Sequence, residues 1–264
     1  MLRSDPVGRA RGMAWEFTDA TAARGPPRPY NTCMRIPLHR GAMALLIALA
    51  APVCWGAGAA KPAAVSWRDS FTSRLEALAL LQSLNADLLS HDSATLTLDR
   101  WCASHHLSDP PTITAERVHD VDKPATAAQR ELLQVSATEP LGYRRVRLHC
   151  GAHVLSEADN WYVPSRLTAQ MNDALNNSDI AFGRAVQALQ FRRRTLSATL
   201  LWAPLPEGWE MAVPAVRVAA AKLTVPPFVL QHTAVLALPD GTPISALTET
   251  YTSEVLAFAP PARR

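Results

Sequence analysis

The stretch YRRVRLHCGAHVLSEADNWYVPSRLT, residues Tyr143 to Thr168, decides the fold of this chain. It predicts a strand, a turn at a glycine and a second strand that ends at Pro164, because apolar and polar side chains alternate along it. In the first strand one face is apolar and the other is cationic: Val146, Leu148 and Cys150 against Arg145, Arg147 and His149. A row of cations is unusual on so apolar a strand, so we expect at least one of them to hold an anionic partner against the sheet. Arg145 is the candidate for that role.

The rest of the chain predicts two helices followed by strands that meet in hairpins. Leucines at three- and four-residue spacing predict a helix over residues 65–90, and a polar segment around Ser93 opens a second helix that ends near His105. Asp240-Gly241 between two strand-like stretches is a strong hairpin signal. Shorter elements are expected as strands over residues 112–118 and 191–202 and as helices over residues 166–175 and 180–186. This order predicts one α+β domain on a single antiparallel β-sheet.

The first 59 residues have the pattern of a leader and not of a folded domain. Residues 34–40 are basic, residues 42–53 are apolar, and Ala57-Gly58-Ala59 is a small-residue cleavage site, which is the order of a secretory signal peptide. The alternative is a transmembrane anchor, which needs ~18 apolar residues. We expect residues 1–33 to be disordered, or not translated if Met34 is the start. The predicted product is a domain of residues 60–264 that is periplasmic or secreted, with no stable membrane anchor after cleavage.

The leader also accounts for the positive charge of the sequence. The chain has 26 basic and 23 acidic residues, and seven of the basic and three of the acidic ones lie within the first 60. The remainder has 19 basic and 20 acidic residues, a net charge of −1. The sequence pI of 8.8 therefore describes the leader, and no nucleic-acid partner is expected from it.

Two cysteines, Cys102 and Cys150, remain after residue 59. In an oxidising compartment they can pair, but Cys150 also fits an ordinary buried strand position, and the sequence leaves both interpretations open. Cys150 with His153, and His105 with His106, lack a second pair of ligands at metal-site spacing, so no metal is expected.

Glu249 is the second candidate site residue, on the same strand face as Leu247 and Tyr251. A carboxylate on an apolar face suits contact with a buried ligand. If Arg145 and Glu249 line one pocket, the Arg145 guanidinium would bind a ligand carboxylate and Glu249 would contact a hydroxyl or ether oxygen of the same ligand. The alternatives are a strand-edge Glu249 in water, or a salt bridge between these two residues. The run Arg192-Arg193-Arg194 is interpreted as a solvated face.

Four stretches, in order, resemble the chorismate lyase family and its fold relatives, which include the ligand-sensing UTRA domain of GntR-type regulators. Residues 88–95 resemble the L-x-x-x-D-S-x-T segment, and residues 143–150 resemble the R-x-x-L-x-C strand. Residues 180–184 are similar to the P-L-G-R helix entry, and residues 241–251 to the final strand G-x-P-x-x-x-x-x-E.

This resemblance implies a single antiparallel sheet with helical flaps that close over a buried aromatic carboxylate. It also implies elimination of pyruvate from chorismate to give 4-hydroxybenzoate, as in ubiquinone biosynthesis, without a cofactor. Arg145 would hold the ring carboxylate, backbone N–H groups near Ala94, Phe182 and Gly183 would assist it, and Glu249 would contact the far oxygen and act as the acid.

Two functions follow, and both use Arg145 and Glu249. The chain is either a chorismate-lyase-like enzyme, a carbon–oxygen lyase, or an exported module that binds a small aromatic carboxylate without turnover. Under both, we expect a monomer with no cofactor, no metal and no nucleic-acid partner.

Overall fold

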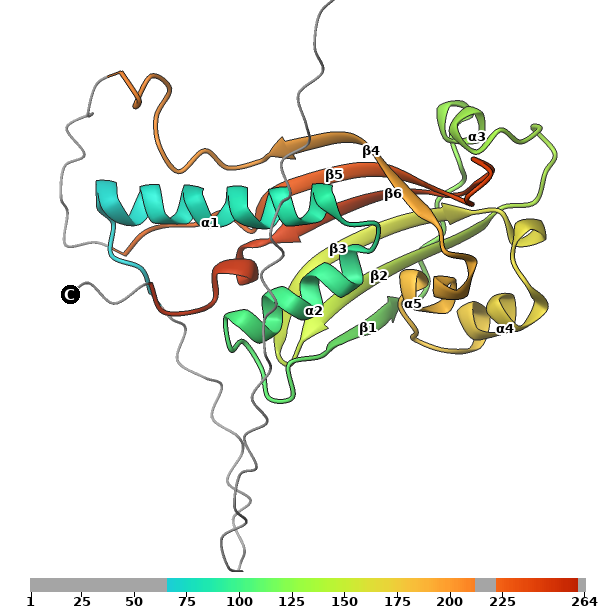
Figure 1. The fold of residues 1–264 in the computed structure, drawn as a ribbon, viewed down its shortest axis with the longest axis horizontal. Helices are drawn as coiled ribbons and strands as arrows, with labels where there is room; N and C mark the ends of the chain where they lie inside the picture. The colour runs from blue at the N-terminus through green and yellow to red at the C-terminus, as the bar shows by residue number, and fades with distance from the viewer. Residues whose placement is uncertain (1–65, 212–221, 261–264) are drawn as a thin grey trace, which may run out of the picture. The chain divides into compact units, whose positions relative to one another are not determined.

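The computed structural model describes residues 66–211 and 222–260, all within one compact unit that runs from Ala59 to Arg264. Its centre is a six-stranded sheet in the order β1-β2-β3-β6-β5-β4, with every neighbouring pair antiparallel. The strands are β1 (Ile113–Val118), β2 (Gly142–Cys150), β3 (His153–Tyr162), β4 (Arg192–Leu200), β5 (Phe228–Ala237) and β6 (Pro243–Thr252). The helices are α1 (Phe71–Ser90), α2 (Ala94–Ser104), α3 (Ala127–Leu133), α4 (Ala169–Asn177) and α5 (Phe182–Ala185). The predicted α+β domain on one antiparallel sheet is confirmed (Figure 1).

Both predicted hairpins form at the glycines that mark them. Gly151, with φ of 57°, turns the chain between β2 and β3, and Gly241, with φ of 90°, turns it between β5 and β6. Glycine is favoured at such positive φ because it lacks a Cβ atom. The second turn is closed by Asp240, whose Oδ1 accepts a hydrogen bond of 2.9 Å from the Thr242 N–H.

Helices α1 and α2 cover one face of the sheet (Figure 1). Each begins at a serine: Ser70 accepts from the Ser73 N–H, and Ser93 accepts from the Leu96 N–H. The inward side of α1 has the predicted helical spacing, with buried Ala77, Leu81, Leu84 and Leu88. A disulfide joins Cys102 on α2 to Cys150 at the end of β2. The cysteines are thus paired, which the sequence had left open.

Several helices differ from their prediction. Helix α1 begins six residues later than expected, because Ser70 is its cap. Helix α3 was not predicted, although Thr126 and Gln129 form a capping box, in which each side chain accepts from the backbone N–H of the other residue. It packs Leu133 against Trp161 and Val235 on the other face of the sheet. Helix α4 begins three residues later than expected, because residues 164–166 form a 3₁₀ turn and Thr168 is the cap.

The predicted leader and signal peptide, residues 1–59, lie outside the described residues and stay predictions. Within residues 66–211 and 222–260, no helix has both the length and the apolar character that a membrane crossing requires.

Candidate functional site

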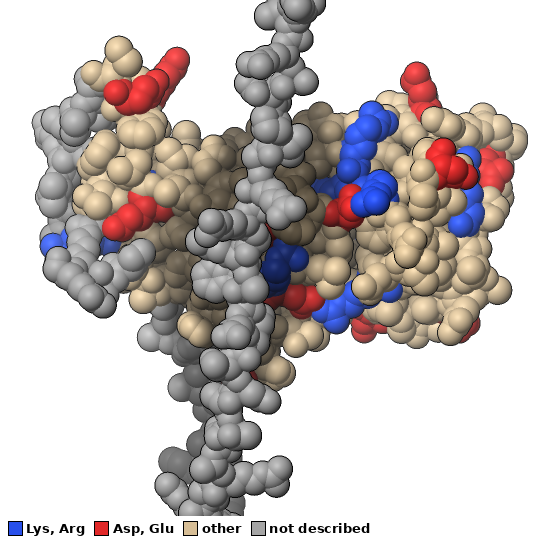
Figure 2. Space-filling model, viewed as in Figure 1, with Lys and Arg blue, Asp and Glu red and all other residues tan. Residues whose placement is uncertain are grey.

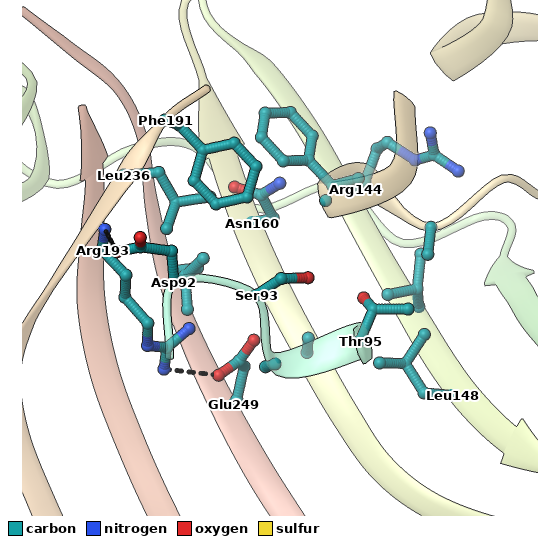
Figure 3. A pocket seen from close by; sticks show the side chains of 17 residues that line it. Asp92, Ser93, Thr95, Arg144, Leu148, Asn160, Phe191, Arg193, Leu236 and Glu249 are labelled. Carbon is teal, nitrogen blue, oxygen red and sulfur yellow. Dashed lines mark hydrogen bonds and ion pairs between the residues drawn. The ribbon is translucent and has the colours of Figure 1, made fainter. Parts of the chain in front are cut away.

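A hollow lies on the sheet face that α1 and α2 cover, which we call the pocket face (Figure 3). It contains about 550 Å³ of empty space when its open mouth is included. Its apolar lining is Ala94, Val146, Leu148, Ala158, Ala181, Phe182, Gly183, Phe191, Leu236 and Leu247. Its polar lining is Asp92, Ser93, Thr95, Arg144, Asn160, Arg193 and Glu249.

The floor of the pocket is set by strand register. Arg144 on β2 is opposite Asn160 on β3, which is opposite Leu247 on β6. Two residues along, Ala158 on β3 is opposite Glu249 on β6. Because side chains alternate between faces, all of these project to the same side of the sheet. The register therefore places a guanidinium and a carboxyl in one pocket, on strands separated by β3.

The roof consists of the segment that opens α2 and of α5. The two approach closely, since a Cβ atom on Gly183 would lie 3.3 Å from Ser93 Oγ. Asp92, in the segment that opens α2, links this segment to β4: it accepts from the Arg193 N–H at 2.8 Å and from Arg192 Nη1 at 3.2 Å. Arg184 Nη2 donates to Asp99 Oδ2 at 2.6 Å and ties α5 to α2. Figure 2 shows that basic side chains on this face of the described residues lie next to acidic ones.

Arg144 is the cation at one end of the pocket, and only 2% of the residue is exposed. Its Nη2 donates to two backbone carbonyls, Ser178 O at 3.3 Å and Ile180 O at 3.1 Å. Its Nε and Nη1 are buried and have no hydrogen-bond partner among the described residues. Burial lowers the pKa of Arg144, and the nearby Arg117 lowers it further, against the opposing effects of Tyr162 and Asp179. Buried guanidinium N–H groups without partners are costly, and an anion that reached them would offset this cost.

Glu249 lies at the other end of the pocket from Arg144 (Figure 3). Its Oε2 accepts from Arg193 Nη2 at 2.7 Å and from the Tyr251 hydroxyl at 3.0 Å. No described residue donates to Oε1, which leaves that oxygen for a ligand. Burial alone would lower the pKa of Arg193, but Glu249, together with Tyr251 and Asp92, outweighs it and raises this pKa. Burial, with Glu249, raises the pKa of Tyr251 well above its usual value, so its hydroxyl stays a donor.

His232 lies directly behind this pair, opposite Glu249 on β5. It is fully buried, and its Nε2 is 2.8 Å from Asn85 Oδ1. Because that oxygen only accepts, Nε2 carries the proton and Nδ1 is the acceptor, for which the described residues offer no donor. Burial lowers the pKa of His232 to about 4, with Arg193 lowering it and Glu249 opposing both.

We expect His232 to make the fold acid-sensitive between pH 6.5 and 4. In the unfolded chain the His232 side chain has its usual pKa of 6.5, whereas in the folded chain this pKa is about 4. The unfolded state therefore binds more protons in this window, and stability falls as the pH falls, by up to about 3 kcal/mol. Urea unfolding of the wild type and of His232→Gln at pH 7 and pH 4.5 measures this. The variant should lose less stability on acidification, and an identical loss in both proteins would contradict the assignment.

The predicted pairing of Arg145 with Glu249 is wrong, because the two side chains lie on opposite faces of the sheet. Arg145 is opposite Asp159, and its Nη2 donates to Glu157 Oε2 at 2.9 Å. It lines a separate hollow on the far face together with Lys123 and others. The physical reason is the two-residue period: position 144, and not 145, shares a face with Val146. Of the other predicted ligand contacts, Ala94, Phe182, Gly183 and Glu249 all line the pocket.

Six of the seven polar residues that line the pocket were not predicted as site residues: Asp92, Ser93, Thr95, Arg144, Asn160 and Arg193. Strand alternation would have indicated Arg144 and Asn160. Arg193 is the middle residue of the run assigned to a solvated face; its side chain is 3% exposed, whereas that of Arg192 is 77% exposed. Alternation within the run is the signal that would have separated them. In the described part of the chain, no group of three or more His, Cys, Asp or Glu residues is placed to hold a metal.

A protein of Sinorhizobium fredii (strain NBRC 101917 / NGR234), named "Uncharacterized protein y4mC", is 57% identical to this chain over 196 residues. The match covers 74% of this chain and 83% of that protein. The chain belongs to the y4mC family. No family model matches it.

Solved structures share only a distant likeness with this member of the y4mC family. PhnF from Mycobacterium smegmatis is 11% identical with a TM-score of 0.41, and the match covers 76% of this chain and 92% of PhnF. The possible transcriptional regulator YydK from Bacillus subtilis is 20% identical with a TM-score of 0.35. That match covers 58% of this chain and 63% of YydK, so the chain spans less than two thirds of that regulator.

Proposed function

We propose that the pocket binds a small organic acid whose carboxylate is held by Arg144. The observation that carries this proposal is the state of Arg144 itself. It lines the pocket, is almost fully buried, and keeps Nε and Nη1 without partners among the described residues. A carboxylate that accepted from them would compensate a buried charge that the protein leaves unpaired.

An aromatic ring fits the walls between the two ends. Phe182 and Phe191 line the pocket beside Leu148, Leu236 and Leu247. Apolar walls with a few polar groups that fix the orientation are typical of small-molecule sites. The proposed ligand is thus a small aromatic carboxylate, of which 4-hydroxybenzoate is the simplest example with a second polar group.

A binding module is favoured over a chorismate-lyase-like enzyme by the contacts of Glu249. A general acid must hold a proton that it can give to the departing oxygen. Glu249 instead accepts hydrogen bonds from Arg193 and Tyr251 at 2.7 and 3.0 Å, which is the arrangement of a carboxylate. In this geometry its free Oε1 is suited to accept from a ligand hydroxyl and not to donate to an ether.

Export of the mature domain is part of the proposal. It is supported by the signal-like segment at residues 34–59 and by the disulfide between Cys102 and Cys150. Disulfides form and persist mainly in oxidising compartments such as the periplasm.

The proposal is tested by two measurements on the purified full chain. Calorimetry should give a dissociation constant for 4-hydroxybenzoate below about 1 mM. Incubation with chorismate should release no pyruvate above the rate without protein. Absence of binding would contradict the proposed ligand class, whereas protein-dependent pyruvate release would show that the lyase function is the correct one.

A further inference from the structure

The ionisable side chains of the pocket are arranged as two oppositely charged ends. Among the described lining residues four are ionisable: Asp92, Arg144, Arg193 and Glu249. Arg144 lies at one end of the pocket, and the other three lie together at the opposite end (Figure 3).

The end at Arg144 has one positive charge without an acidic hydrogen-bond partner. The guanidinium donates only to the backbone carbonyls of Ser178 and Ile180. A neutral donor adjoins it, because Asn160 Oδ1 accepts from the Ser245 hydroxyl and the amide nitrogen is left to face the pocket. This end therefore suits one anionic group.

The end at Glu249 has two carboxylates and one guanidinium. Arg193 is already paired with Glu249 at 2.7 Å, and its backbone N–H already donates to Asp92 at 2.8 Å. The additional partner of Asp92 is Arg192, whose side chain is 77% exposed and whose charge is therefore strongly screened by water. The lining groups at this end sum to one negative charge.

We infer that the pocket selects acids with a single carboxylate that carry, at the opposite end, a hydrogen-bond donor without negative charge. This deepens the proposed function and rests on it. A hydroxyl or amine at that end would donate to the free Oε1 of Glu249. A second carboxylate would lose its hydration beside the negative charges of Asp92 and Glu249. The Arg193 guanidinium at this end already pairs with Glu249 and does not offset that cost. The ligand class is hydroxy- or amino-substituted aromatic monocarboxylates, and dicarboxylates of the same length are rejected.

Calorimetry on the full chain tests this with three probes built on one ring: 4-hydroxybenzoate, 4-aminobenzoate and benzene-1,4-dicarboxylate. We expect the first two to bind with dissociation constants within about tenfold of each other, and the dicarboxylate to bind at least about tenfold more weakly than 4-hydroxybenzoate. Glu249→Gln removes the repelling charge and frees Arg193. It should reduce the preference for 4-hydroxybenzoate over the dicarboxylate by at least about tenfold.

Two further variants keep the test decisive. Glu157→Gln makes the same change in an arginine-paired glutamate on the opposite face, and it should leave the preference unchanged. Asp92→Asn removes the second negative charge of that end at a position with 40% side-chain exposure, and should also reduce the preference if Glu249→Gln does not fold. Equal binding of the dicarboxylate and 4-hydroxybenzoate by the wild type would overturn the inference, as would an unchanged preference in folded Glu249→Gln or Asp92→Asn. Failure of all three probes to bind would instead overturn the proposed function, and this inference with it.

Discussion

Replacing Arg193 with methionine is expected to lower the free energy of unfolding by about 3–5 kcal/mol, because it leaves a buried carboxylate without its counterion. The Arg193 and Glu249 side chains are 3% and 10% exposed, and their atoms are 2.7 Å apart. Methionine keeps most of the aliphatic volume of arginine, so lost packing contributes little. Urea unfolding at neutral pH measures the change.

The matched control is Arg145→Met on the opposite face. Arg145 pairs with Glu157 at 2.9 Å, a similar distance, but these side chains are 31% and 21% exposed. Water competes for an ion pair this accessible, so its removal should cost no more than about 1 kcal/mol. The double variant Arg193→Met with Glu249→Leu should recover much of the lost stability, because neither charge is then left buried alone. Equal losses of stability in Arg193→Met and Arg145→Met would show that the buried ion pair contributes no more to stability than the accessible one.

Local sequence signals were sufficient for the sheet and the long helices. The alternation in residues 143–162 and the turn residues Gly151 and Gly241 predict the hairpins that form. The leucine spacing of residues 75–89 predicts the buried side of α1. The start of α1 was placed six residues too early, since Ser70 is its cap. The other elements that were missed or shifted, such as α3 and α4, are short, and their limits depend on caps and 3₁₀ turns of a few residues. For such elements tertiary packing and capping outweigh the weak periodicity of so short a segment.

The candidate site was only partly predictable. Glu249 could be singled out because a carboxylate among apolar strand neighbours is unusual, and it does line the pocket. The arginine was placed one position too far, because the cationic face of Arg145 and Arg147 was expected to hold the anion, whereas the pocket lies on the apolar face that Arg144 shares with Val146 and Leu148. In a strand, a shift of one residue moves a side chain to the opposite face.

The partner of Glu249 could not be derived from the sequence. Arg193 is 56 residues away and reaches Glu249 from β4, across the intervening β5. Only the strand order brings these residues together, and that order is a property of the whole sheet.

The organisation of the polar groups gives the two sheet faces different properties. On the pocket face, charges are buried and Arg144 is left without an acidic partner. On the opposite face, Arg145 and Arg147 both contact Glu157, in an accessible network. A ligand anion is therefore expected at Arg144, although the two neighbouring arginines are chemically identical.

The affinity of Arg144→Met and Arg145→Met for 4-hydroxybenzoate, compared by calorimetry with the wild type, is the most direct test of the proposed anion site. Loss of Arg144 should weaken binding by about 2–4 kcal/mol, which is roughly 30- to 1,000-fold, because the ligand carboxylate is left buried without its partner. The Arg145 variant should bind within about twofold of the wild type, since its side chain lies on the other face. Thermal unfolding without ligand verifies that both variants are folded. An Arg144→Met protein that is folded and binds as tightly as the wild type, or a greater loss in Arg145→Met, would contradict the assignment of the pocket.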